Sequence, residues 1–263
     1  MKKNRVLILF SLLVLMLIIN ALVLLSFSSQ DDGILPPSYD EEPIISFDSE
    51  LRVTHDDVLF ITEQIKVKSL GKNLKRGITR RLALTMPEDE EGKARALENQ
   101  LVSVLRNGET IAVAEPQEGN GFITYYLGEA DKFLTPGIYH YLFQYSVRSP
   151  IIRKESHKYL KHDITGASLF PVLAASAVVR IPEQLQSENV VFKGHIITPA
   201  DNESGIMKDS KDVKSSFEID DGEIDPASRG TPRIKLWTTR ALQPLERFEI
   251  EVGWAVGVPM PAE

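Results

Sequence analysis

The sequence predicts an all-β protein, an antiparallel β-sandwich that follows one N-terminal transmembrane helix. Three observations lead to this prediction. One long apolar run lies at the N-terminus. From residue 44 onward, apolar and polar residues alternate in many short segments, which is typical of strands with one buried face. Turn signals separate these segments. Strands do not alternate with helices in the sequence, as they would in a parallel sheet.

The N-terminus reads as a membrane-spanning segment. Lys2, Lys3 and Arg5 precede an apolar run from Val6 to Phe27, which as a helix would be about 33 Å long and could cross a bilayer. A cleavable signal peptide usually has a shorter apolar region and ends in a small-residue cleavage site, which is not evident here. We therefore predict an uncleaved signal anchor over residues 1–28, with a cleaved signal peptide as the alternative.

The charges around this segment predict its orientation. Basic residues stand before it and Asp31–Asp32 after it, so we expect the N-terminus inside and everything after about residue 28 outside the cytoplasm. The prediction is a single-pass protein of the cell membrane, tethered by the N-terminal helix. Residues 29–43, with their prolines and acidic side chains, are predicted to form an exposed linker.

Composition narrows the classes of partner and chemistry. The net charge of −7 and the isoelectric point near 5.4 argue against a general phosphate-binding surface, so nucleic acid is not an expected partner. They also argue against the whole domain lying on an anionic lipid surface. The absence of cysteine excludes disulfides, thiolate catalysis and zinc held by cysteine. A chain of 263 residues is nevertheless long enough to bury a sizeable core.

The first predicted sandwich covers residues 44–150 and opens with a hairpin. Residues 44–53 and 58–70 both alternate, and Asp56–Asp57 is expected in the turn between them. One face of the first strand would carry Ile45, Phe47, Ser49, Leu51 and Val53. A strand is expected at about 78–86, followed by a polar insertion, 87–100, that suits a loop or a short surface helix.

Two further signals complete this half. Asn107–Gly108 is a strong dipeptide for a hairpin turn. Pro136 and Gly137 suit the centre of a type II turn that leads into an aromatic strand. One face of that strand carries Tyr139, Tyr141, Phe143, Tyr145 and Val147. We predict that this face lies between the sheets, with Tyr141 and Phe143 buried, and an exposed aromatic platform for sugar or peptide is the alternative.

The second half continues in the same way after a predicted linker, 151–162. Residues 134–147 and 242–256 share the pattern Leu-x-Pro followed by a long alternating strand. The second copy places Phe248, Ile250, Val252, Trp254 and Val256 on one face. This pattern resembles the turn into the sixth strand of fibronectin type III and immunoglobulin-like sandwiches. It predicts a second sandwich over 163–259, and the alternative is that 163–259 continues the first sandwich.

Several phrases occur in a familiar order: "VTHDDVLFITEQIKV", "RGITRRLAL", "GEADKFLTPGIYHYLFQYSV", "HDITG", "ASAVVRIP" and "GWAVGVP". In this the chain resembles the extracytoplasmic N-terminal region of the predicted bacterial membrane proteins grouped as domain of unknown function 2207. The resemblance implies an all-β domain outside the membrane, tethered by helical segments, with no established activity and no catalytic residues to carry over. Members usually continue into further transmembrane helices, which do not follow here.

One acidic loop is a candidate metal site. The stretch "DDGEIDP" clusters oxygen ligands of the kind that calcium prefers: Asp220, Asp221, Glu223 and Asp225. The spacing is not that of an EF-hand, and a solvated hairpin turn is the alternative. No phosphate loop, dinucleotide fingerprint or nucleophile elbow is present in the sequence. Apart from calcium, no cofactor is expected.

One basic run is a candidate binding site for an anionic surface, such as lipid headgroups or an envelope polymer. Its residues are Lys75, Arg76, Arg80 and Arg81. The alternative is a solvated loop with one arginine paired internally. In that case Glu63 is the expected partner of Arg80 across neighbouring strands, and replacing Arg80 would destabilise the domain more than replacing Arg81.

These observations favour a non-enzymatic module that is anchored in the membrane, displayed outside the cytoplasm, and active in interaction or envelope organisation. The expected partners are an envelope protein or a polysaccharide. The alternative is an extracytoplasmic hydrolase, or a metal-dependent binder of envelope sugars, whose carboxylates come together only in the fold.

Overall fold

A computed structural model describes residues 41–86, 94–183, 185, 187–204, 211–220 and 229–256. These residues form strands β1 to β17, one short helix, α2 (Pro199–Ser204), and a 3₁₀ turn, η1 (Ser187–Asn189). The nearly all-β character predicted from the sequence is thus confirmed. The predicted N-terminal helix, 1–28, lies outside the described residues, and within them no helix is both long and apolar enough to span a bilayer.

One large sheet of eight strands forms the base of the molecule. In spatial order its strands are β15 (Val213–Ile219), β16 (Pro232–Thr238), β13 (Ala175–Arg180), β1 (Ile44–Val53), β2 (Leu59–Ser69), β10 (Gly137–Arg148), β6 (Glu98–Arg106) and β7 (Glu109–Thr110). All pairs are antiparallel except β1 and β13, which run parallel. That parallel pair corrects the expectation of a purely antiparallel sheet.

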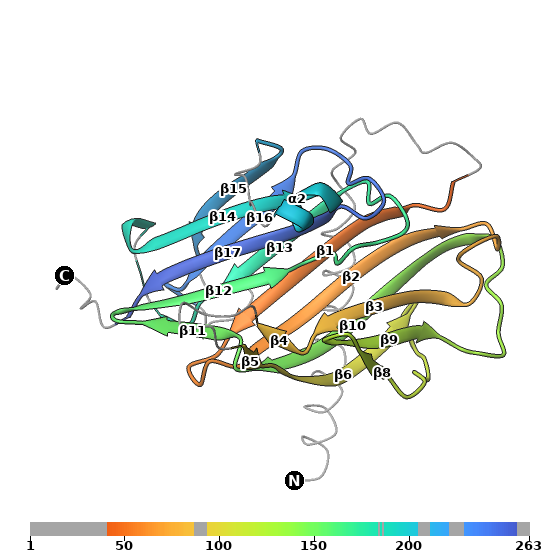
Figure 1. Cartoon of the computed structure of the whole chain (residues 1–263), viewed down its shortest axis with the longest axis horizontal. Helices are drawn as coiled ribbons and strands as arrows, with labels where there is room; N and C mark the ends of the chain where they lie inside the picture. The colour runs from red at the N-terminus through yellow and green to blue at the C-terminus, as the bar shows by residue number, and fades with distance from the viewer. Residues whose placement is uncertain are drawn as a thin grey trace, which may run out of the picture. The chain divides into compact units, whose positions relative to one another are not determined.

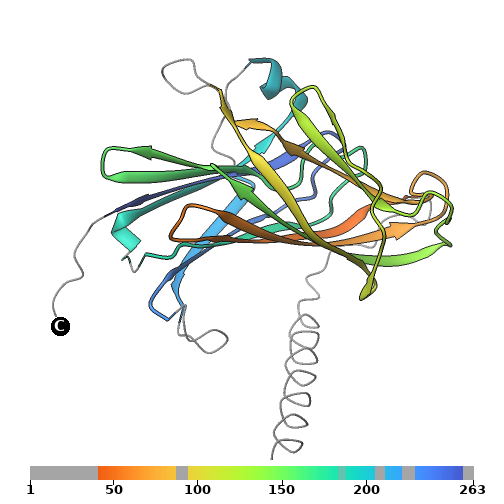
Figure 2. The same ribbon diagram turned by 90° about the horizontal axis from the view of Figure 1, so that it is seen from below.

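Smaller sheets cover one face of this base (Figures 1 and 2). One has four strands: β11 (Ile151–Lys154), β12 (His157–Asp163), β17 (Arg247–Ala255) and β14 (Val190–Ile197). Another has three: β3 (Gly77–Ala83), β9 (Phe122–Gly128) and β8 (Gln117–Gly119). A two-stranded ribbon pairs β4 (Thr85–Met86) with β5 (Arg95–Ala96). The resulting two layers enclose one continuous apolar core.

The sheet pairing favours the alternative that residues 163–259 continue the first sandwich over a second, separate one. Strands β13, β15 and β16 come from the second predicted sandwich, yet they extend the sheet that β1, β2 and β10 form. The predicted linker, 151–162, is occupied by β11 and most of β12. Leu-x-Pro precedes both β10 and β17, which are long strands with a neighbour on either side, and their sheets share a single core.

Alternation places the apolar residues as predicted along most of β1. Phe47, Leu51 and Val53 are buried, and Ser49 lies buried among them. At the start of the strand a register irregularity between Ile44 and Ser46 turns Ile44 inward in place of Ile45. The described part of the opening hairpin agrees with the prediction, with residues 55–57 in the turn.

The aromatic strand β10 lies in the centre of the large sheet, between β2 and β6. Tyr141 is 2% exposed and Phe143 is 0% exposed, so the prediction that both are buried is confirmed. The predicted type II turn is wrong, because Gly137 already belongs to β10 and does not have a positive φ. The Asn107–Gly108 turn is confirmed: both residues have positive φ, and β6 and β7 pair on either side.

Gly128 lies at the end of the β3–β9 pair, where two backbones meet closely. A Cβ on Gly128 would lie 1.8 Å from the carbonyl oxygen of Arg76, while a Cβ on Gly119 would meet nothing within 4 Å. We expect Gly128→Ala to lower the free energy of unfolding by about 3 kcal/mol, because the backbone must shift. Urea unfolding measures this. Gly119→Ala is the matched control, and equal losses for the two would contradict the steric argument.

Candidate functional site

A group of buried polar side chains lies where β2, β3 and β10 meet. The guanidinium of Arg80 donates to both carboxylate oxygens of Glu63, from Nε to Oε2 and from Nη2 to Oε1, each at 2.7 Å. The hydroxyl of Tyr145 donates to Oε1 of Glu63 at 2.9 Å. Arg80 is 4% exposed, Glu63 0% and Tyr145 1%, so the group is shielded from water. The predicted pairing of Glu63 with Arg80 is confirmed.

Arg80 also binds the loop that follows β12. Its Nη1 donates to the carbonyl of Thr165 at 2.8 Å, and its Nη2 donates to that of Ile164 at 3.0 Å. The same guanidinium lies 4.8 Å from the centre of the Phe47 ring in β1. Arg80, which belongs to the three-stranded sheet, therefore connects that sheet to the base sheet and to the loop that follows β12. The residues of this cluster come from four different sequence phrases that resemble the family. These phrases contain Glu63, Arg80, Tyr145 and Thr165.

Burial raises the pKa of Glu63, opposed by the charge and hydrogen bonds of Arg80, while the two 2.7 Å contacts have the geometry of a bidentate ion pair. Burial disfavours the charged guanidinium, but the charge of Glu63 and its hydrogen bonds outweigh burial and raise the pKa of Arg80. Burial, and then the neighbouring Glu63 charge, raise the pKa of Tyr145 well above its ordinary value, so this hydroxyl stays a neutral donor. The arrangement is that of a buried salt bridge whose hydrogen-bonding groups are used within the fold.

His162 and Asp163 lie beside this cluster at the end of β12. His162 Nε2 is 3.4 Å from the hydroxyl of Tyr145. Burial, and then the positive charge of Arg80, lower the pKa of His162 to about 4. Asp163 accepts a hydrogen bond from the backbone N–H of Gly166 at 2.9 Å and pairs with Arg247 at 3.3 Å. Burial is the main cause that raises the pKa of this carboxyl.

The depressed pKa of His162 predicts acid sensitivity. The unfolded chain takes up a proton at this histidine near pH 6.5, whereas the folded protein takes it up only near pH 4. The contribution of His162 to stability is therefore fully present above pH 6.5 and is lost as the pH falls from 6.5 toward 4. We expect His162→Gln to lose less melting temperature between pH 7.5 and 5 than the native chain does. His157→Gln, at an exposed position, is the control, and identical pH profiles for all three proteins would refute the prediction.

The predicted basic site is only partly at the surface. Lys75, Arg76 and Arg81 are exposed, but Arg80 is buried and paired, so its inclusion in a surface site is wrong. Strand alternation explains the difference, because neighbouring residues of β3 point to opposite faces. Arg81 lies 4.3 Å from the centre of the Phe122 ring, and Arg76 lies 4.5 Å from that of Phe133.

The predicted calcium ligands are placed by the structure only in part. Asp220 follows β15 and forms an ion pair with Arg180, which also binds Glu50 at 2.7 Å. The other three candidates, Asp221, Glu223 and Asp225, lie outside the described residues. Within the part of the chain that the structure describes, no three acidic or histidine side chains gather in a way that could hold a metal ion.

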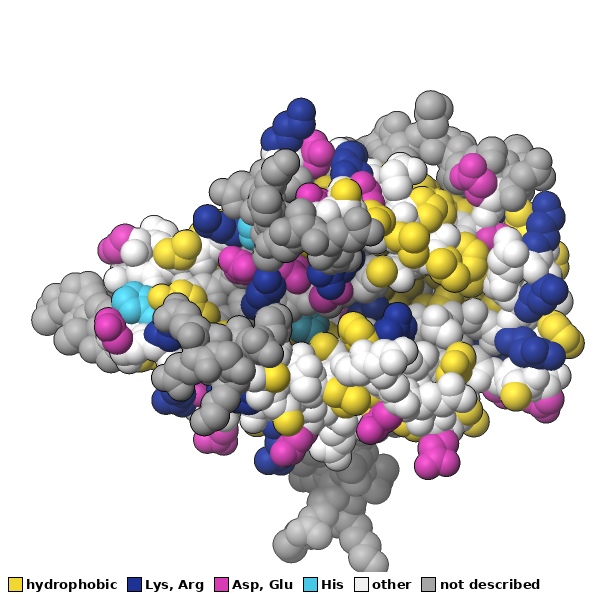
Figure 3. All heavy atoms as spheres, in the orientation of Figure 1, with side chains coloured by type: hydrophobic (Ala, Val, Ile, Leu, Met, Phe, Trp, Pro, Cys, Tyr) yellow, Lys and Arg dark blue, Asp and Glu magenta, His cyan; other side chains and the backbone are white. Residues whose placement is uncertain are grey.

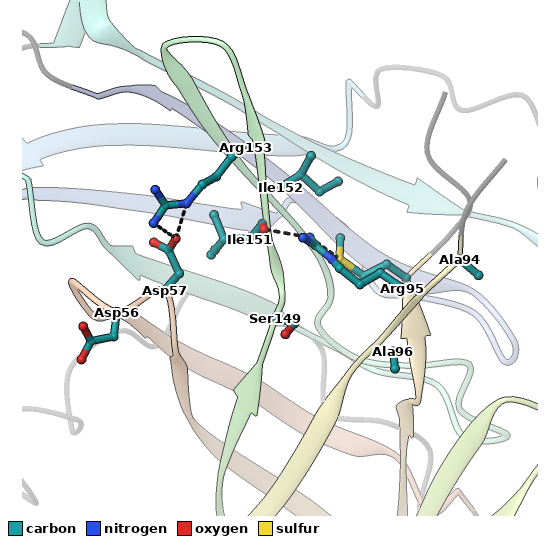
Figure 4. A pocket seen from close by; sticks show the side chains of 10 residues that line it. Asp56, Asp57, Ala94, Arg95, Ala96, Ser149, Ile151, Ile152 and Arg153 are labelled. Carbon is teal, nitrogen blue, oxygen red and sulfur yellow. Dashed lines mark hydrogen bonds and ion pairs between the residues drawn. The ribbon is translucent and has the colours of Figure 1, made fainter. Parts of the chain in front are cut away.

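A cavity of about 630 Å³ lies beside the turn between β1 and β2 (Figure 4). Its lining combines that turn, the β4–β5 ribbon and the residues around the start of β11: Asp56, Asp57, Met86, Ala94, Arg95, Ala96, Ser149, Ile151, Ile152 and Arg153. Both signs of charge are therefore present at its wall. Asp57 and Ser149 have φ of 57° and 64°, values that residues other than glycine rarely adopt.

Ion pairs hold the charges of this cavity in place. Nε of Arg153 donates to Oδ2 of Asp57 at 2.7 Å, and Lys158 binds Asp57 at 2.9 Å and Glu183 at 2.8 Å. Arg95 donates to the carbonyl oxygen of Ile151 at 2.7 Å. From the sequence, Asp57 is predicted only as a turn residue. The cavity is not predictable in this way, because its lining comes from segments far apart in the chain and no local pattern connects them.

Solved structures with some likeness share little sequence with this chain. One is a putative protease from Parabacteroides distasonis, with a TM-score of 0.44 and 11% identity, covering 81% of this chain and 40% of that one. Yeast LTA4 hydrolase has a TM-score of 0.43 and 11% identity, covering 84% and 30%. An M1 zinc metallopeptidase from Deinococcus radiodurans has a TM-score of 0.40 and 8% identity, covering 80% and 42%. Scores below 0.5 do not establish a shared fold.

Sequence comparison gives a firmer result. The uncharacterized protein YciQ of Escherichia coli (strain K12) is 34% identical over 134 residues, which cover 49% of this chain and 20% of YciQ. The matching region thus spans about a fifth of that relative's length. The model of the family described as "Predicted membrane protein (DUF2207) N-terminal domain" matches residues 43–254. The chain therefore belongs to the DUF2207 family of predicted membrane proteins, whose N-terminal domain makes up most of its length.

Proposed function

We propose that this chain is a membrane-anchored β-sandwich module, displayed outside the cytoplasm, that acts by binding or organising envelope components rather than by catalysis. The observation that carries the proposal is that the buried charged groups pair with one another and connect the sheets. Glu63, Arg80 and Tyr145 neutralise and bind one another and join the sheets. This buried ionisable cluster thus serves to make a rigid scaffold.

The location is supported by the N-terminal sequence and by the family. Lys2, Lys3 and Arg5 precede the apolar run 6–27, and acidic residues follow it, which supports a location of the β domain outside the cytoplasm. The family is one of predicted membrane proteins. An immunoglobulin-like two-layer sandwich is a suitable scaffold for such display, because its loops can vary while the core remains fixed.

The location is tested with a single cysteine. The chain has no cysteine of its own, and Val191 on β14 is 63% exposed, so Val191→Cys creates one unique labelling site. A membrane-impermeant maleimide should label this variant on spheroplasts without permeabilisation, and the protein should stay in the membrane fraction after an alkaline wash. Labelling only after permeabilisation, or release by the wash, would refute the proposed location.

The mode of action is tested by complementation. In a strain that lacks the gene and shows an envelope-stress phenotype, Asp56→Asn/Asp57→Asn removes both carboxylates that line the cavity. A module that acts through its scaffold and loops should retain its function in this variant, once circular dichroism shows that the variant is folded. Loss of function in a folded variant would favour the second candidate.

That second candidate is a binder or hydrolase of envelope sugars, which the cavity favours. Its volume lies in the range of small-molecule sites, and its wall offers carboxylate, guanidinium and hydroxyl groups that can bind a polyol. A metal-dependent form would use calcium at the acidic loop from Asp220 to Asp225. Calorimetric titration of the native chain with envelope oligosaccharides, with and without Ca²⁺, distinguishes these forms, because the metal-dependent form gives heat with the sugar only when Ca²⁺ is present.

A further inference from the structure

The chain enters the β domain at a well-defined place. Glu42, which is 5% exposed, precedes β1, and its carboxylate accepts hydrogen bonds from backbone N–H groups of the loop after β2. The donors are Leu70 at 2.6 Å, Lys72 at 3.2 Å, Asn73 at 2.6 Å and Leu74 at 3.1 Å. Burial opposes the charge, but these bonds outweigh it and lower the pKa of Glu42. The end of the predicted linker is therefore a fixed part of the domain.

A second loop lies at the same entry. The N–H of Ile44 donates to the carbonyl of Pro171 at 2.9 Å, and the N–H of Leu173 donates to the carbonyl of Ile44 at 2.9 Å. The N–H of Leu245 reaches Ser168 of this loop at 2.6 Å. The first described residues of the chain therefore bind two loops directly, 70–76 through Glu42 and 168–173 through Ile44. The loop 243–246 is connected to them through Ser168.

The loops 168–173 and 243–246, and the loop between β9 and β10 that contains Phe133, present large apolar side chains to solvent. Leu169 is 75% exposed, Phe133 64% and Leu245 44%. Leu245 has a φ of 68°, a conformation that leucine rarely adopts, so the fold holds an exposed apolar side chain in a strained backbone. In Figure 3 hydrophobic side chains gather on the right-hand half of the visible face. Exposed apolar groups that gather in this way mark interaction surfaces.

Positive charge accompanies the apolar residues. Lys75 and Arg76 are exposed in the loop after β2. The Arg76 guanidinium stacks on Phe133, and the N–H of Leu134 donates to the carbonyl of Lys75 at 2.7 Å, so the two loops are held together. An exposed aromatic ring next to lysine and arginine suits the interface between lipid headgroups and acyl chains.

We propose that this surface, the entry face, rests on an anionic phospholipid bilayer. It comprises Lys75, Arg76, Phe133, Leu169 and Leu245. The inference rests on the proposed membrane anchoring. Residues 28–41 separate the predicted anchor from the domain, and a random coil of that length has an end-to-end distance on the order of 20 Å. The chain thus delivers the entry face to the membrane surface, where lysine and arginine bind anionic headgroups and the apolar side chains enter the interface.

The test uses the absence of native cysteine in the full-length chain. Leu169→Cys and Val191→Cys each receive one nitroxide spin label, and each protein is reconstituted into nanodiscs that contain phosphatidylglycerol. We expect the label at 169 to show a several-fold higher ratio of oxygen to nickel-chelate collisions than the label at 191. Adding Lys75→Glu/Arg76→Glu should lower the ratio at 169, and so should nanodiscs of phosphatidylcholine alone.

Three results would overturn the inference. The label at 169 could show the same water exposure as the label at 191. It could become immobile without gaining contact with oxygen, which would assign the entry face to a protein partner. The collision ratio of the label at 169 could also stay high after Lys75→Glu/Arg76→Glu and in nanodiscs of neutral lipid. That result would refute the binding of anionic headgroups by Lys75 and Arg76. Failure of the anchoring itself is distinguishable, because the chain would then leave the membrane in the alkaline wash while both labels remained in water.

Discussion

Arg80→Ala should be among the most damaging single substitutions in this domain. It removes a guanidinium that is 4% exposed and leaves the carboxylate of Glu63, which is 0% exposed, without its counter-charge. Breaking one partner of a buried ion pair costs about 3–5 kcal/mol. Two loop carbonyls, those of Ile164 and Thr165, also lose their donor. Urea unfolding, followed by the fluorescence of the two tryptophans, measures the loss.

The adjacent arginine supplies the control. Arg81 is exposed and stacks on Phe122, so Arg81→Ala should cost no more than about 1 kcal/mol. If Arg80→Ala does not fold, Arg80→Lys keeps the charge without the planar fork and should give a smaller, measurable loss. The double variant Glu63→Met/Arg80→Met should be more stable than Arg80→Ala, since it leaves no unpaired charge. Equal unfolding free energies for Arg80→Ala and Arg81→Ala would refute the claim that the buried pair of Arg80 and Glu63 stabilises the domain.

Phe143→Ala should produce a loss of similar size for a different reason. The ring is 0% exposed in the centre of β10, with ring centres of Tyr125 at 5.4 Å and Tyr145 at 4.9 Å. Removing it leaves a cavity between the two layers, which typically costs about 3–5 kcal/mol. Thermal and urea unfolding should both report the change.

Ile138 is the matched position for this substitution. It lies on the same strand but is 51% exposed, so Ile138→Ala should stay within about 1 kcal/mol of the native chain. A loss at Ile138 as large as that at Phe143 would mean that the aromatic face of β10 does not carry the core.

The sequence predicted those features that depend on local pattern. Alternation identified the buried aromatic face of β10, because a half-buried strand requires it. It also identified the apolar face of β17, although the opposite face of that strand is largely buried as well. The Asn107–Gly108 turn was predictable because few dipeptides tolerate two positive φ values. The pair of Glu63 and Arg80 could be proposed because both stand in the phrases that resemble the family.

Long-range pairing could not be predicted in the same way. The parallel pair of β1 and β13 has no local signature, since it joins strands about half the chain apart without a helical crossover. The cavity likewise depends on segments around residues 56, 95 and 151. Alternation fixes which face of a strand is buried, and it does not specify which strand lies beside it.

The parallel pair has a consequence for how the chain is made. Strand β1 is among the first elements to be synthesised, yet its neighbour β13 begins only at Ala175. Until then the backbone groups of one edge of β1, between Phe47 and Arg52, have no strand to pair with, and such an edge is a template for association between chains. This is a contact of high sequence separation, which slows folding. A fragment ending near residue 150 should therefore aggregate through β1, whereas the same residues in the full chain should not.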